Sequence, residues 1–487
     1  MYIGVDIGTS SVKAVSIDNH GVIKNIQQIT YPIFSSSPDF QEQDPEEIFN
    51  ATVKVLKDIL ADNEDNKHQI KAISFSAAMH SLMAIDATGK PLTQLITWAD
   101  SRAKQIADNL RETDLGKQIY RQTGTAVHAM SPLCKLLWFR EYQAELLAEA
   151  HKFIGIKEYV FFKLFGEYVI DFSLASATGL FDVFNLKWYK DSLQLIGIEE
   201  NKLSTPVPTT AIFQTKKFPE FANINFIIGA SDGCLANLGV GAVEEGQIAT
   251  TIGTSGAIRM TSSQAFADEQ MRTFCYYTVD NQYVIGGAVN NGGIILQWLR
   301  EAFSPNETVE NIFQSAKNIS AGSEGLVFLP YLLGERAPIW DSSAKGVFFG
   351  IGKNHTQAHF YRAVLEGIIF ALYSVGKVFK QIQYAQKEPC IYATGGFTKS
   401  DFWVQMMADI FNQKILVPNS SESTAIGACI LAMKALGEIS EWEEAQKMIP
   451  IAKEFLPDEA NHTVYMKNFS VFEKLYLALK PLFHYNN

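Results

Sequence analysis

The same short motif occurs twice in the sequence, almost half a chain apart. Residues 7–11 read IGTSS and residues 252–256 read IGTSG in a chain of 487 residues. Each copy lies between two apolar runs of β-forming residues, a pattern that predicts a β-hairpin with a tip of small residues. We infer an internal duplication, with one domain over residues 1–243 and a second over residues 244–487. The expected hairpin strands span residues 2–7, 12–17, 247–252 and 257–260.

The rest of the chain alternates between strand and helix patterns, which predicts an α/β fold. Buried strands are followed by small-residue turns and helices, and such turns put ligands at the carboxyl ends of strands. An Asp-Pro pair at residues 44–45 is a typical helix start. The stretch from the hairpin tip to the last Gly-rich turn is longer in the first half, Asp6 to Asp232, than in the second, Thr251 to Gly395. We expect the extra residues, about 98–180, to form a substrate-specific lobe. Strands are expected at 70–75, 82–86, 225–228 and 390–394, and helices at 45–60 and 399–412.

Composition excludes several classes of protein. Lys and Arg number 41 and Asp and Glu 52, a net charge of −11, so the chain lacks the basic surface that non-specific nucleic-acid binding needs. Five cysteines without a CxxC pair argue against a disulfide framework and favour a reducing, cytoplasmic setting. The apolar stretch 365–379 contains a lysine and is too short to cross a membrane, so we expect a buried helix. The start of the sequence does not resemble a signal peptide.

The two hairpin tips are candidates for binding phosphate. Glycine allows close approach of the backbone, and successive N–H groups form an anion-binding nest. Asp6, just before the first tip, is a candidate magnesium ligand, and Lys13 a candidate for neutralising phosphate. The alternative is that both are ordinary tight hairpins. No P-loop, protein-kinase or HExxH motif occurs. The candidate tip residues are Gly8, Thr9, Ser10, Gly253, Thr254 and Ser255.

Several motifs together resemble those of the FGGY family of carbohydrate kinases, within the actin–hexokinase–heat-shock ATPase superfamily. This resemblance implies two actin-like (ribonuclease H-like) domains with a central cleft, each with a five-stranded mixed sheet covered by helices on both faces. It also implies ATP and Mg²⁺ as cofactors. The motifs are DIGTSSVKA at 6–14, MSPLCKLLWF at 130–139, TIGTSGA at 251–257, GVFFGIGKNHTQAHFYRAVLE at 346–366 and ATGGFTKS at 393–400.

Asp232 follows a buried strand and opens a helix. The resemblance implies that it is the general base, which removes the proton of the sugar hydroxyl that attacks the γ-phosphate. It would also contribute with Asp6 to the magnesium site. The alternative interpretation is that Asp232 only caps its helix, a role that Asp favours.

The resemblance also assigns the substrate side. Met79, His80, Trp98, Asp100 and Arg102 are implied to contact the sugar, although His80 alone would more often be structural and Arg102 could be a surface charge. The segments around these residues resemble gluconate-specific members most, so we expect D-gluconate to be converted to 6-phospho-D-gluconate, with D-xylulose as the alternative substrate. A buried carboxylate needs a cation, and the candidates are His80, Arg102, His128 and Lys157.

The nucleotide side is implied to lie in the second half. Gly293 and Gln297 resemble positions near the ribose and phosphates, and the ring of Phe397 is expected to stack on adenine. A different class, a nucleotide-binding sugar sensor, remains open, but a repressor would need a basic helix-turn-helix that the sequence does not show. Expected partners are a small sugar or sugar acid and ATP, without nucleic acid or membrane, and with a possible homodimer. The implied purine-pocket residues are Gly395, Gly396, Phe397 and Ser400.

Overall fold

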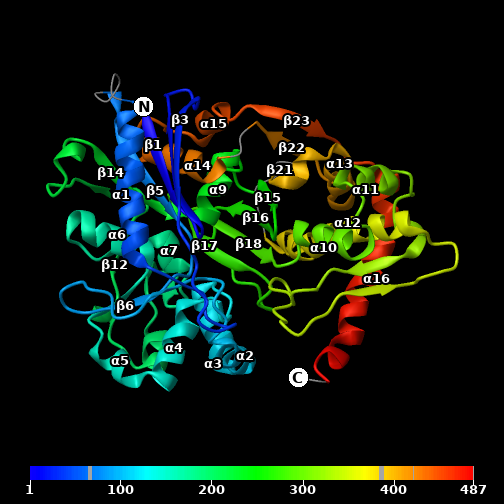
Figure 1. Cartoon of the computed structure of the whole chain (residues 1–487), viewed down its shortest axis with the longest axis horizontal. Coiled ribbons are helices and arrows are strands. Elements are labelled where there is room, and N and C mark those ends of the chain that lie inside the picture. The colour runs from blue at the N-terminus through cyan, green and yellow to red at the C-terminus, as the bar shows by residue number, and fades with distance from the viewer. Residues whose placement is uncertain (64–68, 383–388, 420–421, 486–487) are drawn as a thin grey trace. The chain divides into compact units, whose positions relative to one another are not determined.

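The computed structural model describes residues 1–63, 69–382, 389–419 and 422–485 (Figure 1). Its contacts divide the chain into two compact units. The first contains Met1–Glu244, Ser262–Ile285 and Glu422–Ile449, and the second contains Glu245–Thr261, Gly286–Ser421 and Pro450–Asn487. The first break lies one residue from the boundary expected after residue 243. Two later segments belong to the first unit, however, so the compact units are not the linear halves 1–243 and 244–487.

The first unit is built on a six-stranded sheet in the order β13-β14-β5-β1-β2-β3. The predicted first hairpin is confirmed, because β1 and β2 pair antiparallel with Asp6 opposite Lys13. Strands β1, β5 and β14 run parallel to one another. The strands are β1 (Tyr2–Ile7), β2 (Ser11–Ile17), β3 (Ile23–Thr30), β5 (Ala72–Ala77), β13 (Ile212–Phe213) and β14 (Asn225–Ser231).

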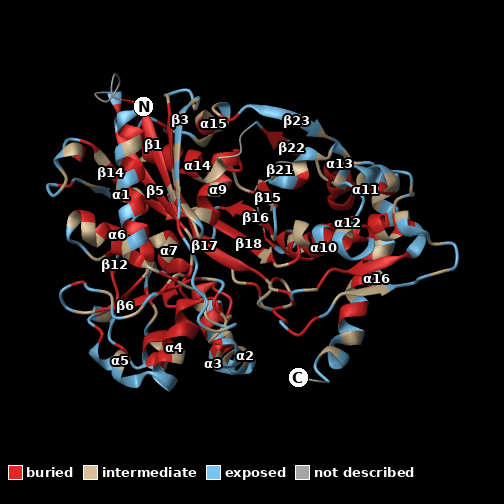
Figure 2. Cartoon of the chain, in the orientation of Figure 1, coloured by how far each residue is buried: buried red, intermediate tan, exposed pale blue. Residues whose placement is uncertain are grey.

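Helices cover both faces of this sheet because β1 is apolar on both sides. Ile3 and Val5 belong to the core that includes α1 (Pro45–Ala61), and Tyr2 belongs to the core that includes α14 (Ser423–Ala435). Figure 2 shows β1 buried and an exposed outer stripe on α1. The helix α14 approaches β1 closely, since a Cβ on Gly4 would lie 1.9 Å from the Ala425 carbonyl oxygen. As predicted, Asp44 caps α1, accepting from the Glu46 amide at 2.8 Å.

The second hairpin belongs to a seven-stranded sheet in the order β17-β18-β16-β15-β21-β22-β23. Its hairpin, β15 with β16, is also confirmed. In both sheets a hairpin strand pairs parallel with a later strand, and an antiparallel edge strand closes that side. The expected five strands per sheet are therefore too few, because each sheet has additional edge strands. The strands are β15 (Ile248–Ile252), β16 (Gly256–Ser262), β17 (Phe274–Tyr277), β18 (Tyr283–Val289), β21 (Ile391–Thr394), β22 (Ile415–Pro418) and β23 (Ile451–Phe455).

The other predicted elements are present, with shifted ends. The strand expected at 225–228 continues to Ser231, and the helix expected from 399 begins at Asp401 after a short 3₁₀ turn, η6 (Gly396–Lys399). The apolar stretch 365–379 lies mostly in α12 (Gln357–Gly376), which is buried. Among the described residues, no helix is long and apolar enough to cross a membrane.

The segment expected to form a substrate lobe, about 98–180, is mainly helical in the first unit. It contains α2 (Lys104–Glu112), α3 (Asp114–Thr123), α4 (Pro132–Tyr142), α5 (Ala144–Glu149), β8 (Lys152–Ile154), α6 (Ile156–Phe165), β9 (Val169–Asp171) and α7 (Phe172–Ser176). The first unit also contains β4 (Glu42–Gln43), β6 (Met83–Ile85), β7 (Leu95–Ile96), β10 (Phe181–Asp182), β11 (Lys187–Trp188), α8 (Lys190–Ile196), β12 (Thr205–Val207), α9 (Asp232–Val240) and α15 (Trp442–Lys447). The second unit adds α10 (Gly293–Phe303), α11 (Val309–Lys317), β19 (Val327–Leu329), β20 (Val347–Phe349), α13 (Asp401–Phe411) and α16 (Glu459–Phe483).

Candidate active site

Three predicted functional segments meet at one edge of the first unit's sheet. The parallel strands β1, β5 and β14 end level with one another, because Ala77 is in register with both Ile7 and Ser231. The first hairpin tip follows β1, the Met-His pair at 79–80 follows β5, and Asp232 follows β14. Ligands of α/β sheets bind at such carboxyl edges. The register therefore brings together residues that lie up to 224 positions apart in the sequence.

A β-bulge in β14 sets the position of Asp232 at the end of the strand. The register with β5 shifts between Ile227 and Ala230, and Gly229 has a φ of 75° there. A Cβ on Gly229 would lie 1.7 Å from the Phe75 carbonyl oxygen, so only glycine fits. Asp232 is then the first residue of α9, and its Oδ1 accepts from the Gly233 amide at 2.7 Å. This position lets the carboxylate interact with the helix terminus and still stand at the sheet edge.

The end of β14 is also held from behind by a buried lysine. The Lys157 ammonium donates to the Ala230 carbonyl at 3.0 Å and lies 2.6 Å from the Asp171 carboxylate. Both side chains are almost completely buried. Lys157 is therefore already paired within the protein. The carbonyl that it holds, that of Ala230, lies two residues before Asp232.

Asp6 is the second carboxylate of this edge. Its Oδ1 is buried and has no hydrogen-bond partner among the described residues. Burial, followed by the negative charge of Asp232, raises the pKa of Asp6 to about 6. A bound cation would reduce the repulsion between the two carboxylates and would give the unsatisfied oxygen a partner. Lys13, the predicted phosphate neutraliser, is instead 2.7 Å from the Glu422 carboxylate in this structure.

The first hairpin tip is braced by side chains from neighbouring segments. The Trp98 indole N–H donates to the Thr9 hydroxyl at 2.9 Å, which joins the predicted sugar residue to the predicted phosphate tip. Gln43 donates to the Thr9 carbonyl at 2.7 Å, and Tyr31 donates to the Gly8 carbonyl at 2.5 Å. The contacts of Gln43 and Tyr31 could not be predicted from the sequence, since no local pattern marks a side chain that reaches a distant turn.

His80 stands in an uncommon backbone conformation after β5. Its φ is 67°, in the left-handed region, and its Nδ1 is 2.8 Å from the Ala177 carbonyl oxygen. A carbonyl only accepts, so Nδ1 carries a proton. Strained residues of this kind are concentrated at functional sites. His80 is 9% exposed and Met79 is partly buried against the same unit's core.

Arg102 and Asp100 form a buried pair with each other, which corrects two expectations. The Arg102 guanidinium donates to both Asp100 oxygens at 2.8 Å, and its side chain is only 4% exposed. It also bridges to Glu42 and lies 3.8 Å from the Phe40 ring centroid. Asp100 in addition accepts from the Gln41 amide. Arg102 is thus not a surface charge, and neither residue presents an open charge to a sugar. Through these contacts both side chains link the loop that carries Trp98 to residues 40–42.

The second unit gathers the predicted nucleotide residues in a similar way. The amide of Gly293, at the start of α10, donates to the Gly253 carbonyl of the second tip at 2.7 Å, and the Ile294 amide donates to Thr254 at 3.2 Å. Gly395 has a φ of 97°, and a Cβ there would lie 2.5 Å from the Ile252 carbonyl oxygen. The start of α10 and the turn after β21 therefore both touch the end of β15. Gln297 is exposed on α10 and donates to Glu301.

A pocket of about 440 Å³ adjoins the predicted purine residues of the second unit. Gly396 and Ser400 line it, as expected, but Phe397 does not. The Phe397 side chain is 2% exposed and packs edge-on against Trp403, with ring centroids 5.8 Å apart, so its ring is not available to stack on adenine. Two aromatic residues line the pocket, Phe313 of α11 and Phe402 of α13. The remaining lining residues are Val309, Glu310, Gln314, Lys317, Lys399, Asp401 and Lys453.

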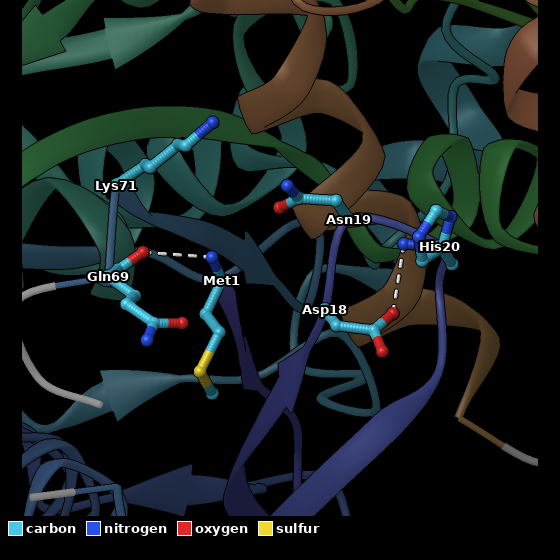
Figure 3. A pocket seen from close by; sticks show the side chains of 6 residues that line it. All are labelled: Met1, Asp18, Asn19, His20, Gln69 and Lys71. Carbon is cyan, nitrogen blue, oxygen red and sulfur yellow. Dashed lines mark hydrogen bonds between the residues drawn. The ribbon is translucent and has the colours of Figure 1, made fainter. Parts of the chain in front are cut away.

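A second pocket, of about 460 Å³, lies at the opposite edge of the first unit's sheet (Figure 3). It is lined by Met1 and Lys71, which precede β1 and β5, and by residues 18–20, which follow β2. Gln69 completes it, and its carbonyl accepts from the Met1 amino group at 2.9 Å. The amino ends of the parallel strands face this pocket, so it is not the carboxyl-edge site.

The fold and these sites define a two-unit α/β protein with a carboxylate pair in one unit and, in the other, a pocket beside the Gly395–Gly396 turn. The model of the FGGY family of carbohydrate kinases, N-terminal domain, matches residues 1–239, and the C-terminal domain model matches residues 248–436. The chain belongs to the FGGY family of carbohydrate kinases, and it has that family's actin-like fold.

Individual relatives are similar over nearly the whole chain. A gluconokinase of Bacillus subtilis is 43% identical, covering 97% of this chain and 95% of that protein. A crystal structure of gluconate kinase from Lactobacillus acidophilus matches with a TM-score of 0.93 and 37% identity, covering 98% of each chain. A ligand-bound structure of xylulose kinase from the same organism matches with the same TM-score and coverage and 36% identity.

Proposed function

We propose that this chain transfers the γ-phosphate of ATP to D-gluconate and forms 6-phospho-D-gluconate. The observation that supports the reaction most is the register of β1, β5 and β14, which brings a small-residue tip, the Met-His loop and Asp232 to one edge. The choice of gluconate is supported by the 43% identity to a gluconokinase over almost the full length.

Asp232 is the general base of the proposed reaction. It accepts the proton of the acceptor hydroxyl as that oxygen attacks phosphorus. The amino end of α9 favours the ionised carboxylate before the reaction. The bulge at Gly229 and the Lys157 contact to Ala230 fix the backbone that carries it.

Mg²⁺ is the cation that this proposal includes. Among the described residues, no group of three or more His, Cys, Asp or Glu side chains is placed to hold a metal ion. Mg²⁺ in phosphate-transferring sites, however, needs only one or two carboxylates, because waters and phosphate oxygens complete its shell. The buried, unsatisfied Oδ1 of Asp6 fits such a ligand. When bound, the ion would neutralise phosphate charge.

The chain's own residues bind the nucleotide in this proposal. The hairpin tips, through the backbone N–H groups and hydroxyls of residues 8–10 and 253–255, would contact the phosphates. The absence of a side chain at Gly293 and at Gly395 lets the start of α10 and the turn after β21 pack closely against Gly253 and Ile252. The pocket at Gly396 and Ser400 would take the adenosine, with the Phe313 ring as its apolar wall. Lys13 would have to leave Glu422 to reach a phosphate.

D-xylulose is the alternative substrate, supported by the 36% identity to a structure named as a xylulose kinase. The carboxylate of gluconate needs a cationic or multi-donor partner. Arg102 and Lys157 are already paired with buried carboxylates. Either cation would have to leave its carboxylate to pair with that of gluconate, and the other two predicted partners in the proposal are His80 and His128. A cytoplasmic location, which the free state of all five cysteines favours, belongs to the same proposal.

The test is an assay of ADP release by the purified chain with MgATP and a panel of sugars and sugar acids. We expect release with D-gluconate, and a product phosphorylated on the terminal hydroxyl by ³¹P NMR. ADP release that is independent of every acceptor would contradict a kinase and favour the nucleotide-binding sensor.

A further inference from the structure

We propose that Lys135 is a positioning residue that holds the two substrate loops of the first unit, residues 79–80 and 97–102, in one fixed arrangement. The inference rests on the proposed function for those loops. It assigns a role to a residue that contacts neither of the substrates and that the sequence pattern alone marks only as a polar residue in an apolar helix.

The Lys135 ammonium joins the two loops directly. Lys135 lies on α4 and its side chain is fully buried. Its Nζ donates to the His80 carbonyl at 2.6 Å and to the Thr97 carbonyl at 2.8 Å, with the Ile96 carbonyl at 3.5 Å. His80 belongs to the loop after β5, and Thr97 precedes Trp98 in the loop after β7. One side chain from a third element therefore fixes the separation of the two loops.

The energetic cost of this arrangement argues for a specific role. Burying an ammonium group is expensive unless it is well paired. Burial lowers the pKa of Lys135 to about 7; the negative charge of Asp100 raises this pKa, and the positive charge of Arg102 lowers it. The neighbouring positions Leu133, Leu136 and Leu137 are apolar, so packing alone would favour an apolar residue at 135. The Lys135 ammonium adds a charged donor to these carbonyls, of which that of Ile96 also accepts from the Leu82 amide at 3.0 Å and that of Thr97 from the Asp100 amide at 3.3 Å.

The backbone of His80 shows what the contact stabilises. A residue with a φ of 67° is strained. The ring of His80 is held by the Ala177 carbonyl, and its own carbonyl is held by Lys135. The same ammonium holds the residue before Trp98, whose indole contacts Thr9 of the phosphate tip. Removing the ammonium frees both loops to move, although it changes none of the side chains that are proposed to contact the substrates.

The experiment compares Lys135→Met with a matched control, Lys202→Met. Lys202 also donates to three carbonyls in the same unit, those of Leu147, Ala148 and Ala150, at 2.7–3.0 Å, but none of them belongs to a substrate loop. For each folded variant, KM for gluconate, KM for ATP and kcat are measured, together with the thermal shift caused by each substrate.

We expect Lys135→Met to raise the KM for gluconate roughly tenfold to a hundredfold, the loss of one charge-assisted contact, with the KM for ATP nearly unchanged. Lys135→Arg, which keeps the charge, should recover part of the affinity, and Lys202→Met should behave like the wild type. A gluconate KM within about twofold of wild type in Lys135→Met, or an equal loss for both substrates, would overturn the proposal. If neither Lys135 variant folds, the residue serves folding rather than positioning, and the proposal is also wrong. If the wild-type chain does not phosphorylate gluconate, the proposed function fails first.

Discussion

At the scale of single residues, the proposed chemistry of the first unit depends on two carboxylates, Asp6 and Asp232, at one sheet edge. Their mutual repulsion and the burial of Asp6 store an electrostatic cost in the protein without ligands. Such a cost is typical of binding sites, where a cation later removes it. The two carboxylates therefore make separate, testable contributions to stability and to turnover.

We predict that Asp6→Asn stabilises the protein without ligands while it impairs the use of MgATP. The pKa of Asp6 is about 6 in the folded chain, above the unfolded value of about 3.9. The free energy of unfolding therefore falls as the pH rises between these two values, and the asparagine removes that loss. Urea unfolding without Mg²⁺ should show a gain on the order of 1–3 kcal/mol at pH 7 and none below about pH 4. A less stable variant at pH 7 would contradict this account.

Asp232→Asn should keep the fold and the binding of ATP but lose roughly 10²–10⁴ in kcat, the usual effect of removing a general base. Asp114→Asn is the matched control, because Asp114 is also the first residue of a helix, α3, and is exposed. If both variants lose only stability, Asp232 serves its helix terminus and not the reaction.

For Arg102 the prediction differs from the one that its sequence position suggests. Arg102→Met leaves the Asp100 carboxylate buried without its cation, which should cost about 3–5 kcal/mol of stability. Since the guanidinium contacts protein rather than substrate, kcat/KM should fall in equal proportion for gluconate and for xylulose. Arg111→Met, a less buried arginine of the same lobe, is the control. A stable variant with a loss confined to gluconate would restore Arg102 as the carboxylate partner.

At the scale of elements, the structure follows the sequence where local pattern decides. Both hairpins, α1 with its Asp44 cap, and the strand before Asp232 could be predicted, because alternation, small-residue turns and capping residues are local signals. The partners of Arg102 could not, since Glu42 lies 60 residues away and reaches it only through the pairing of β4 with β7. The burial of Phe397 was equally hidden, because it depends on Trp403 packing over a turn.

The turn after β21 gives a prediction at this scale. Gly395→Ala should raise the KM for ATP and destabilise the protein by about 1–3 kcal/mol, because alanine is strained at a φ of 97° and its Cβ would meet β15. Gly437→Ala is the control, with a φ of 73° but no atom within 4 Å of its Cβ. If the two variants have the same KM for ATP, the close approach to β15 is not what shapes the nucleotide site.

At the scale of the whole molecule, the chain repeats one sheet plan twice and uses each copy differently. The repeated tip motif indicated the duplication, and the common strand order of the two sheets agrees with it. The return of residues 422–449 to the first unit could not be predicted, because it depends on α14 packing over Gly4, a contact between residues more than 400 positions apart. The first copy carries Asp232 and the loops that we propose to bind the acceptor, and the second carries the pocket lined by Gly396 and Ser400.

The central claim is that this member of the family acts on a sugar acid. The most direct measurement is kcat/KM for D-gluconate and for D-xylulose on the unmodified chain with saturating MgATP. The account predicts a clear preference for D-gluconate, because a site that pairs a carboxylate leaves its donors unsatisfied with a neutral ketose. A clear preference for D-xylulose would contradict the claim, although the fold and the role proposed for Asp232 would remain.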